Sequence, residues 1–373
     1  MNICIITYKY PSKHNTSDYA FVKQLVDAIA AQGIHCSVLA PFSISHYKRL
    51  TVSKEEYAVG EGKVTVIRPG YLSFSKFKIG KFNLSLWAHK RAFKRAFRKL
   101  DTKPDVIYGH FWSAAYCGYE LAKKNNIPLL VASGESEISK MFAAPLDVRE
   151  FAEYVSGVIC VSSKNRDESI KLGLTSIEKC GVFPNAVNVE LFHKRDKSEC
   201  RQQLGLPQNE FIVVFVGWFN DRKGAQRIAE AINRTGGVKS IFIGKGEQDP
   251  QCDGILFKGP MPHDQVPIYL GAADCFVLPT RAEGCCNAVV EAMACGLPII
   301  SSNLPFNWDV LDETNSIMVD PNDIDEIANA IRLMRDDTDL RENLSKGALL
   351  KAESLTIDRR AQAIVDFISS KIV

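Results

Sequence analysis

The sequence lacks any apolar stretch long enough to cross a lipid bilayer. The longest, Phe211–Phe219, is far shorter than the roughly 20 residues that a spanning helix needs. The N-terminal segment MNICIITYKY also lacks the basic region that precedes the apolar core of a secretory signal peptide. Apolar residues make up 46% of the chain and charged residues 24%, which is typical of a folded globular protein. We therefore expect a cytoplasmic protein.

The chain also lacks the residue patterns of metal sites and disulfide frameworks. Its 11 cysteines form no CxxC pair, and the adjacent Cys285 and Cys286 suit neither a normal disulfide nor a zinc site. Its seven histidines show no ligand spacing. Asp323-Ile324-Asp325 resembles a metal-chelating DxD pair, but it opens a predicted helix, which favours helix capping. We expect reduced thiols, no metal and no cofactor.

The net charge is small, +3, but it is unevenly distributed. Residues 1–184 carry 26 Lys and Arg against 16 Asp and Glu, whereas residues 185–373 carry 20 against 27. A basic half beside an acidic half indicates that the first half meets an anionic partner. Residues 62–100 alone hold 11 Lys and Arg and no acidic residue.

Within residues 76–100, apolar and basic side chains recur at rough helical spacing. The apolar residues are Phe82, Leu86, Phe93, Phe97 and Leu100, and the basic ones are Lys90, Arg91, Lys94, Arg95, Arg98 and Lys99. A basic amphipathic helix is typical of a surface that binds anionic lipid. The alternative is a solvated helix that packs on the first domain through its phenylalanines. Because no nucleic-acid-binding motif accompanies the charge, we do not expect RNA or DNA as a partner.

Short apolar runs alternate with amphipathic helical patterns along the chain. In the first half these runs are Ile3–Thr7, Cys36–Leu39, Asp105–Tyr108, Leu129–Ala132 and Val158–Val161. In the second half they are Phe211–Val216, Ser240–Ile243, Ile255–Phe257, Cys275–Leu278, Pro298–Ser301 and Ile317–Val319, and the helical patterns include Ala225–Asn233, Asp264–Leu270, Asn287–Ala294 and Asp323–Met334. This alternation predicts an α/β protein with parallel sheets that helices cover on both faces.

The alternation pauses at residues 184–188, which we interpret as a linker. We predict two facing, doubly wound, Rossmann-like domains, residues 1–184 and residues 185–354, with a helix in residues 355–373 completing the first. Ligands of such sheets bind beyond the carboxyl ends of the strands, so a cleft between the domains is the expected site.

The most informative segment is LPTRAEGCCNAVVEAMACGLP, residues 278–298. A strand ends, a loop carries Glu283 and Gly284, and a helix begins near Asn287. Backbone N–H groups at a helix start bind anions such as a diphosphate, and Gly284 lets the backbone approach a ligand closely. Glu291, one turn into the helix, could accept hydrogen bonds from a ribose diol, and Glu283 could reach a sugar hydroxyl. Alternatively, Glu283 only complements the helix dipole and Glu291 is a solvated residue.

A second segment, residues 211–231, has an apolar strand, Gly217, a polar turn and then Arg222-Lys223-Gly224 at the start of a helix. Two cations at a helix N-terminus are unfavourable for the helix dipole unless an anion binds there. The alternative is a solvent-exposed turn.

These segments resemble the retaining glycosyltransferases of the GT-B fold, in the family numbered four. Glu283 and Glu291 match the E-x7-E motif of that family, and residues 215–224 match its diphosphate-binding strand, loop and helix. Residues 184–188 with Phe192 match its linker. The three motifs occur in the order of the family, and the resemblance covers nearly the whole chain.

The resemblance implies a role for each matched residue. Glu291 binds the donor ribose, while Glu283 and the amides of Gly284, Cys285 and Cys286 hold the sugar. Lys223 stabilises the departing diphosphate. The remaining expected donor contacts are Gly217, Asn287 and the loop around Lys258, which lies against the base.

The chain departs from the family pattern in three places. Trp218 stands where the family usually has Arg, and Arg222 is a candidate for the missing cation. The family often has a His near residues 131–135, and none is present here. The nearest is His110, which either lines the cleft on the acceptor side or satisfies a local hydrogen bond; we favour the second. The loop of residues 11–20 lacks the paired glycines of the family.

We therefore predict a metal-independent, retaining hexosyltransferase. It would move a sugar from a UDP- or GDP-sugar to a glycan or lipid-linked acceptor in cell-surface polysaccharide synthesis, at the inner face of the plasma membrane. Two alternatives remain open: a sugar-nucleotide 2-epimerase of the same fold, and a non-catalytic subunit that binds nucleotide sugar.

Overall fold

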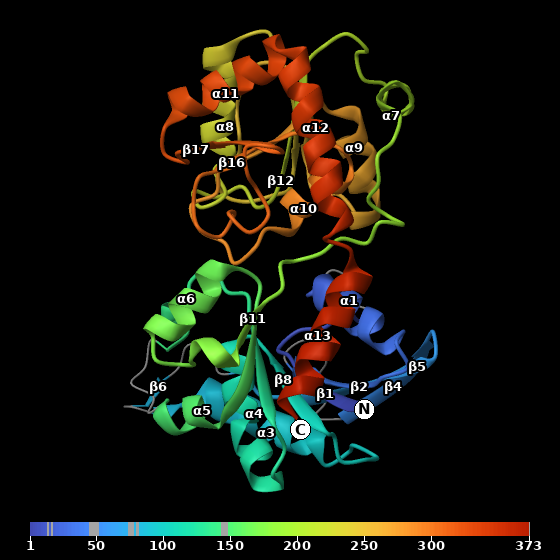
Figure 1. Cartoon of the computed structure of the whole chain (residues 1–373), viewed down its shortest axis with the longest axis vertical. Coiled ribbons are helices and arrows are strands. Elements are labelled where there is room, and N and C mark those ends of the chain that lie inside the picture. Colours follow the sequence, from blue (N-terminus) through green and yellow to red (C-terminus); the bar gives the residue numbers. More distant parts are fainter. Residues whose placement is uncertain are drawn as a thin grey trace. The chain divides into compact units, whose positions relative to one another are not determined.

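The computed structural model describes residues 1–12, 15, 18–44, 52–73, 78, 79, 82–142 and 148–372. The chain divides into two compact units (Figure 1). Unit 1 contains Met1–Phe183 and Asp358–Val373, and unit 2 contains Pro184–Ile357. The segments that enter and leave unit 2 pair with each other there: Val187 N–H donates to Leu355 O at 2.9 Å, and Ile357 N–H donates to Val187 O at 3.0 Å.

Unit 1 is built on a mostly parallel sheet with the strand order β11-β10-β9-β8-β1-β2-β5-β3, to which β4 adds as an antiparallel partner of β5. These strands are β1 (Asn2–Ile6), β2 (His35–Leu39), β3 (Phe42–Ser43), β4 (Val52–Val59), β5 (Gly62–Tyr71), β8 (Val106–His110), β9 (Leu129–Ser133), β10 (Val155–Cys160) and β11 (Cys180–Val182). β6 (Lys78–Ile79) and β7 (Phe82–Asn83) form a separate ribbon. The strand order reverses between β1 and β8.

The unit 1 helices pack their apolar faces on this sheet. They are α1 (Ala20–Ala30), α3 (Leu84–Phe97), α4 (Trp112–Asn125), α5 (Arg149–Tyr154), α6 (Ser163–Lys171) and α13 (Ile357–Lys371), with short 3₁₀ turns at η1 (Ser139–Phe142) and η2 (Ile177–Lys179). α13 buries Ala361, Ile364 and Ile368, whose spacing of three to four residues places them on one helix face. The Phe367 ring packs edge-on against Phe183, with ring centroids 5.3 Å apart.

Unit 2 is built on a fully parallel sheet among its described strands, in the order β14-β13-β12-β15-β16-β17. The strands are β12 (Ile212–Val216), β13 (Lys239–Ile243), β14 (Ile255–Gly259), β15 (Cys275–Leu278), β16 (Ile299–Ser302) and β17 (Ser316–Val319). The helices are α7 (Lys197–Leu204), α8 (Ala225–Thr235), η3 (His263–Gln265), α9 (Val266–Ala272), α10 (Asn287–Ala294), α11 (Ile324–Asp336) and α12 (Thr338–Glu353). Its strand order reverses between β12 and β15.

The predicted α/β architecture with parallel sheets is confirmed, but the sequence analysis missed several elements, of which two show why. One is the antiparallel pairing of β4 with β5, because the mostly exposed residues of β4 have no apolar run. The other is α12, which buries only Leu344, Ala348 and Ala352 and so has a weak apolar stripe. No helix in the described ranges is both long and apolar enough to cross a membrane.

A buried ion pair anchors α7 in unit 2. Arg201 Nη2 lies 2.7 Å from Asp274 Oδ2, and their side chains are 3% and 6% exposed. Arg201 Nε donates to Ala272 O at 2.9 Å, and the Ile212 backbone N–H donates to Asp274 Oδ2 at 2.7 Å. The pair therefore joins α7 to the beginnings of β12 and β15.

We predict that Asp274→Ala lowers the free energy of unfolding by about 3–5 kcal/mol, because it leaves the Arg201 guanidinium buried without a counter-charge. Urea-induced unfolding of the full chain measures the change. Glu120→Gln is the matched control, since Glu120 pairs with Lys90 at the surface with 68% of its side chain exposed; it should change stability by no more than about 1 kcal/mol. Equal effects of the two substitutions would contradict the anchoring role.

Candidate functional site

Two loops meet at the carboxyl edge of the unit 2 sheet. They follow β12 and β15, between which the strand order reverses, and open parallel sheets bind ligands at such a reversal. The first loop leads into α8 and the second into α10. The Arg281 backbone N–H donates to Arg222 O at 2.9 Å and so holds the two loops side by side.

The three residues predicted to be catalytic form one charged cluster between these loops. Glu283 Oε1 lies 2.7 Å from Lys223 Nζ and 2.5 Å from Arg222 Nη1. The Lys223 and Glu283 side chains are only 12% and 13% exposed, whereas Arg222 is 37% exposed. Because two cations share one carboxylate, the cluster keeps a positive charge that an incoming anion could neutralise.

The surroundings of Lys223 keep its amine protonated. Burial lowers the pKa of Lys223, but Cys286 and Glu283 raise it by more, so that its pKa lies above the ordinary value. The Cys286 Sγ atom is 3.6 Å from Lys223 Nζ. Burial, which lowers the pKa of an amine, raises the pKa of the Cys286 thiol. The Glu283 carboxylate, 2.7 Å from Lys223 Nζ, is the acidic partner of the ammonium.

Gly224 allows the two loops to approach this closely. It caps α8 with φ 83°, in the left-handed region that favours glycine. A Cβ atom there would lie 2.6 Å from Arg227 Nη2 and 3.0 Å from Pro279 O. At the other end of the first loop, Gly217 is similarly confined, since a Cβ atom would lie 3.1 Å from the Phe215 ring.

The start of α10 has no side-chain cap. The predicted donor contacts Gly284, Cys285, Cys286 and Asn287 occupy this turn, in which Cys286 is the N-cap residue and makes no capping hydrogen bond through its side chain. A helix start that its N-cap side chain does not cap is a suitable position for an anion. Asn185 Nδ2 donates to Cys285 O at 2.8 Å and fixes the turn from the linker side.

Glu291, one turn into α10, has a partner that the sequence analysis did not predict. His263 Nε2 lies 2.9 Å from Glu291 Oε1, and the two side chains are 45% and 14% exposed. This hydrogen bond raises the pKa of His263 above its ordinary value. The Phe192 ring packs against His263 with centroids 5.0 Å apart. The only signal in the sequence was a lone His at a predicted helix start, and lone histidines have many other roles.

Lys258, in β14, and Trp218, just after β12, both lie toward the carboxyl edge of the sheet. Lys258, near the end of β14, pairs with Asp249 at 2.6 Å, so it is held near the edge but is not an unpaired cation. Trp218, directly after Gly217, is 57% exposed, and Lys245 Nζ lies 5.8 Å from the centre of its ring. Where the family usually has Arg, this chain therefore presents an aromatic face with a lysine beside it.

His110 lies in unit 1 at the end of β8, and the local hydrogen bond favoured for it is absent. The ring is 6% exposed, and within the described residues neither ring nitrogen has a hydrogen-bond partner. Burial, together with the Arg360 guanidinium, lowers the pKa of His110 to about 3. The ring is packed among aromatic side chains, with the Phe111 centroid 4.6 Å away. His110 is therefore a neutral, buried imidazole.

The predicted capping role of Asp323 is confirmed, since its side chain accepts a hydrogen bond from the Glu326 backbone N–H at 3.0 Å. Asp325 instead pairs with Arg234 at 2.6 Å. In the part of the chain that the structure describes, no group of three or more His, Cys, Asp or Glu side chains is arranged to hold a metal ion. Four residues of the loop of residues 11–20, numbers 13, 14, 16 and 17, lie outside the described residues.

Each half of the chain matches a family model. Residues 20–191 match Glycosyltransferase Family 4, and residues 196–350 match Glycosyl transferases group 1. The Bacillus subtilis strain 168 protein TuaC, named for a glycosyltransferase of teichuronic acid biosynthesis, is 27% identical over 356 residues, which are 89% of this chain and 88% of TuaC.

Two further proteins are similar to this chain. An Escherichia coli UDP-Gal:alpha-D-GlcNAc-diphosphoundecaprenol alpha-1,3-galactosyltransferase is 28% identical over 261 residues, 63% of this chain and 67% of that protein. The crystal structure of Anabaena HepE with UDP-glucose has the same fold, with a TM-score of 0.71 at 18% identity over 99% of this chain and 100% of HepE. The resemblance found in the sequence is confirmed, and the chain belongs to the glycosyltransferases of the GT-B fold, with a family 4 region followed by a group 1 region.

Proposed function

We propose that this protein is a metal-independent, retaining glycosyltransferase that moves a hexose-type sugar from a UDP- or GDP-sugar to a glycan or lipid-linked acceptor in cell-surface polysaccharide synthesis. The observation that carries the proposal is the cluster of Lys223, Arg222 and Glu283 beside the uncapped start of α10. A diphosphate is the anion that both features suit, because it meets two fixed cations and the backbone amides of a helix start together.

The carboxylates of the site each keep one oxygen available for the donor. The contacts of Glu283 with Lys223, Arg222 and Thr280 are all at Oε1, and Glu291 accepts from His263 also through Oε1. Among the described residues, Oε2 of each therefore has no protein partner. We assign Glu283 Oε2 to a sugar hydroxyl and Glu291 Oε2 to the ribose diol.

In the proposed reaction, the bond between the anomeric carbon and the diphosphate oxygen breaks while the acceptor oxygen bonds to the same face of that carbon. The acceptor proton passes to the leaving diphosphate. Negative charge on the diphosphate grows during this step, and Lys223, Arg222 and the α10 amides stabilise it where it develops. The reaction needs no protein carboxylate as a nucleophile.

The relatives support the substrate classes of the proposal. The E. coli relative is named for a UDP-sugar donor and a diphosphoundecaprenol acceptor, TuaC for a cell-wall polysaccharide, and HepE was crystallised with UDP-glucose. A thermal-shift screen against UDP- and GDP-sugars would select the donor, because a bound ligand stabilises the folded state by mass action.

We predict that Lys223→Ala lowers turnover with the selected donor by a factor of roughly 10² to 10³, the usual effect of removing one preorganised donor in a transition state. Wild-type turnover should survive EDTA. Release of the nucleotide measures both. Arg222→Ala should reduce turnover nearly as much if Arg222 replaces the cation missing at Trp218.

Lys346→Ala is the matched control, since Lys346 is an exposed lysine of the same unit on α12. It should leave turnover unchanged. Loss of wild-type activity in EDTA that Mg²⁺ or Mn²⁺ restores would refute the metal-independent mechanism, and full activity of Lys223→Ala would remove Lys223 from the site.

A further prediction concerns the hydrogen bond between His263 and Glu291. We propose that His263 orients the Glu291 carboxylate for the ribose. The pKa of His263 is raised in the folded protein. The pair therefore stabilises the folded protein fully below the ordinary His pKa of about 6.5, and this stabilisation is lost as the pH rises through the raised pKa of His263. We expect the His263 imidazole, followed by NMR, to titrate above about 6.5 in the wild type and lower in Glu291→Gln.

Donor affinity should follow the same ionisation. In His263→Ala, donor binding should weaken and lose its dependence on pH across the titration range of His263. A wild-type imidazole that titrates below its ordinary pKa would show that the two side chains do not pair in solution.

We propose a peripheral contact with the inner face of the plasma membrane, and the structure limits which basic residues of α3 and of the segment after it could make this contact. Phe93 is fully buried with Ala88, Ala92 and Ala96, so this apolar face packs inside unit 1 as the solvated-helix alternative predicted. Lys90 pairs with Glu120 at 2.7 Å, and Arg95 donates to Gly70 O at 2.5 Å. The exposed basic residues are instead Arg91, Lys94, Arg98 and Lys99, with the exposed Trp87 beside Arg91. Lys76 and Lys81, in the same predicted segment, lie outside the described residues.

We predict that replacing Arg91, Lys94, Arg98 and Lys99 with Gln weakens binding to phosphatidylserine-containing vesicles at low salt, each residue contributing about 1 kcal/mol. Vesicle co-sedimentation measures the effect. The control removes four exposed charges from elsewhere in unit 1: Lys124, Lys140, Arg149 and Lys171. An equal loss of vesicle binding in both variants would indicate an effect of net charge alone. A wild-type protein that does not bind these vesicles would refute the membrane contact.

A further inference from the structure

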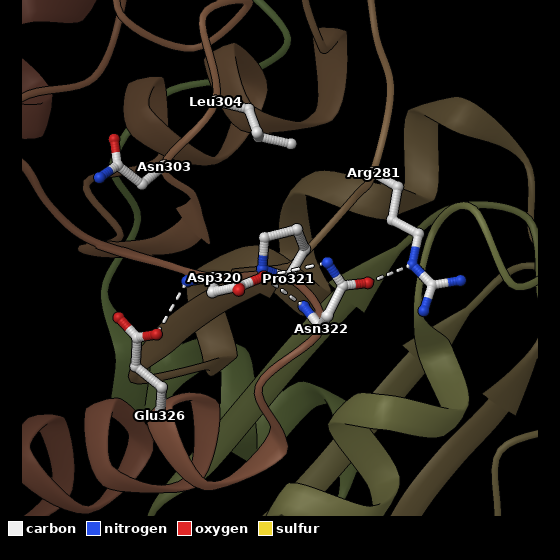
Figure 2. A pocket seen from close by; sticks show the side chains of 7 residues that line it. All are labelled: Arg281, Asn303, Leu304, Asp320, Pro321, Asn322 and Glu326. Atoms are coloured by element: carbon white, nitrogen blue, oxygen red, sulfur yellow. Dashed lines mark hydrogen bonds between the residues drawn. The ribbon is translucent and has the colours of Figure 1, made fainter.

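A polar pocket of about 660 Å³ opens in unit 2 outside the Lys223–Glu283 cluster (Figure 2). Its volume lies in the range of small-molecule sites, roughly 300–1,000 Å³. The side chains that line it include Arg281, Asn303, Leu304, Asp320, Asn322 and Glu326. None of the residues proposed above for donor binding or catalysis is among its lining residues.

Three neighbouring strands supply this pocket. Arg281 follows β15, Asn303 and Leu304 follow β16, and residues 320–322 follow β17, while Glu326 lies in the first turn of α11. Figure 2 shows the Arg281 side chain directed toward Asn322 and the Glu326 side chain rising from α11 toward Asp320, with Asn303 and Leu304 on a separate loop. The pocket is therefore at the carboxyl edge of the sheet, where α/β proteins bind ligands, but displaced along the sheet from the β12–β15 reversal.

Hydrogen bonds within the pocket fix its polar side chains. Asp320 Oδ1 accepts from the Asn322 backbone N–H at 2.8 Å, and Asn322 Oδ1 accepts from Arg281 Nε at 2.7 Å. The Asp320 backbone N–H donates to Glu326 Oε2 at 3.0 Å. Within the described residues, Asp320 Oδ2, Glu326 Oε1 and the side-chain nitrogen of Asn303 have no protein partner. The pocket thus offers preorganised acceptors and a donor.

The charge of the pocket selects against anions. Asp320 and Glu326 bring two carboxylates, and the Arg281 guanidinium is already paired with Asp221 outside the lining. A phosphate or carboxylate would face repulsion there. A neutral ligand rich in hydroxyl groups would instead donate hydrogen bonds to the free carboxylate oxygens, and bonds to charged acceptors are the stronger kind.

An exposed aromatic ring stands beside these groups. Trp308 is 56% exposed, and its Nε1–H donates to Asn303 Oδ1 at 3.0 Å. The indole N–H is therefore satisfied by a pocket residue, and the ring is tied to the pocket rim with apolar surface in solvent. A sugar ring carries hydroxyl groups at its edge and C–H groups on its face, so it fits carboxylate acceptors next to an indole.

We propose that this pocket is a second carbohydrate subsite, which binds a neutral sugar unit separately from the nucleotide-sugar site. The polar side chains accept the hydroxyl groups, and Trp308 covers the apolar face of the ring. The proposal does not depend on the transfer reaction proposed above, since it requires only that the pocket bind a sugar.

The test uses the full chain with UDP present in excess and four neutral probes: the methyl glycosides of glucose, galactose, mannose and N-acetylglucosamine. Saturation-transfer NMR and calorimetry should show binding of at least one probe. Trp308→Ala and Glu326→Ala should each weaken that binding by about tenfold or more, as expected for the loss of one ring contact or one charged acceptor. Both residues are at the surface, so both variants should fold, which circular dichroism verifies.

Two controls separate this pocket from other sites. Leu350→Ala removes a 70% exposed apolar side chain of the same unit, and Glu291→Ala alters the proposed donor site; both should keep wild-type affinity for the probe. Inorganic phosphate should not displace the probe. The proposal is overturned if no glycoside binds, if binding survives in Trp308→Ala and Glu326→Ala, if Glu291→Ala abolishes it, or if phosphate competes.

Discussion

The Glu283 carboxylate joins the two loops that build the candidate site and brings two cations together. The loops follow β12 and β15, which are far apart in the chain and become neighbours only through the reversal of strand order. One oxygen accepts from Lys223, Arg222 and Thr280, so a single group fixes both cations against their mutual repulsion. The tight turn at Gly224 and the open start of α10 are both arranged around this contact. The proposed diphosphate site depends on this contact.

Much of the fold could be predicted because buried parallel strands are continuous apolar runs, which are visible without any knowledge of their partners. The runs at residues 212–216 and 275–278 are examples, and the α10 segment was predicted at its observed bounds. β4 was missed because its exposed charged residues carry no such pattern, and α12 because few of its residues are buried. Both elements bury little apolar surface, but β5 was also missed although its Val64, Val66 and Ile67 are fully buried.

The site was predicted in part for a different reason. Lys223, Glu283 and Glu291 lie in short sequence motifs, and such motifs can be recognised without a structure. The contact of His263 with Glu291 joins η3 to α10 and exists only after folding. For His110, the predicted position at a strand end was correct, but the hydrogen bond expected for its ring is absent among the described residues. Whether its ring nitrogens find partners depends on every neighbouring side chain. Local sequence therefore predicts which groups are present at an edge, and packing decides their chemistry.

The division of unit 1 into two stretches of sequence has a consequence for its biosynthesis. Phe183 and the residues around it pack on α13, yet α13 follows all of unit 2 in the chain. Domains generally fold as units during translation, with N-terminal regions first. Here the ribosome must complete unit 2 before it delivers the helix that covers the first sheet. The nascent first unit therefore keeps the surface that Ala361, Ile364 and Ile368 of α13 cover exposed to solvent until residues 358–372 have been synthesised.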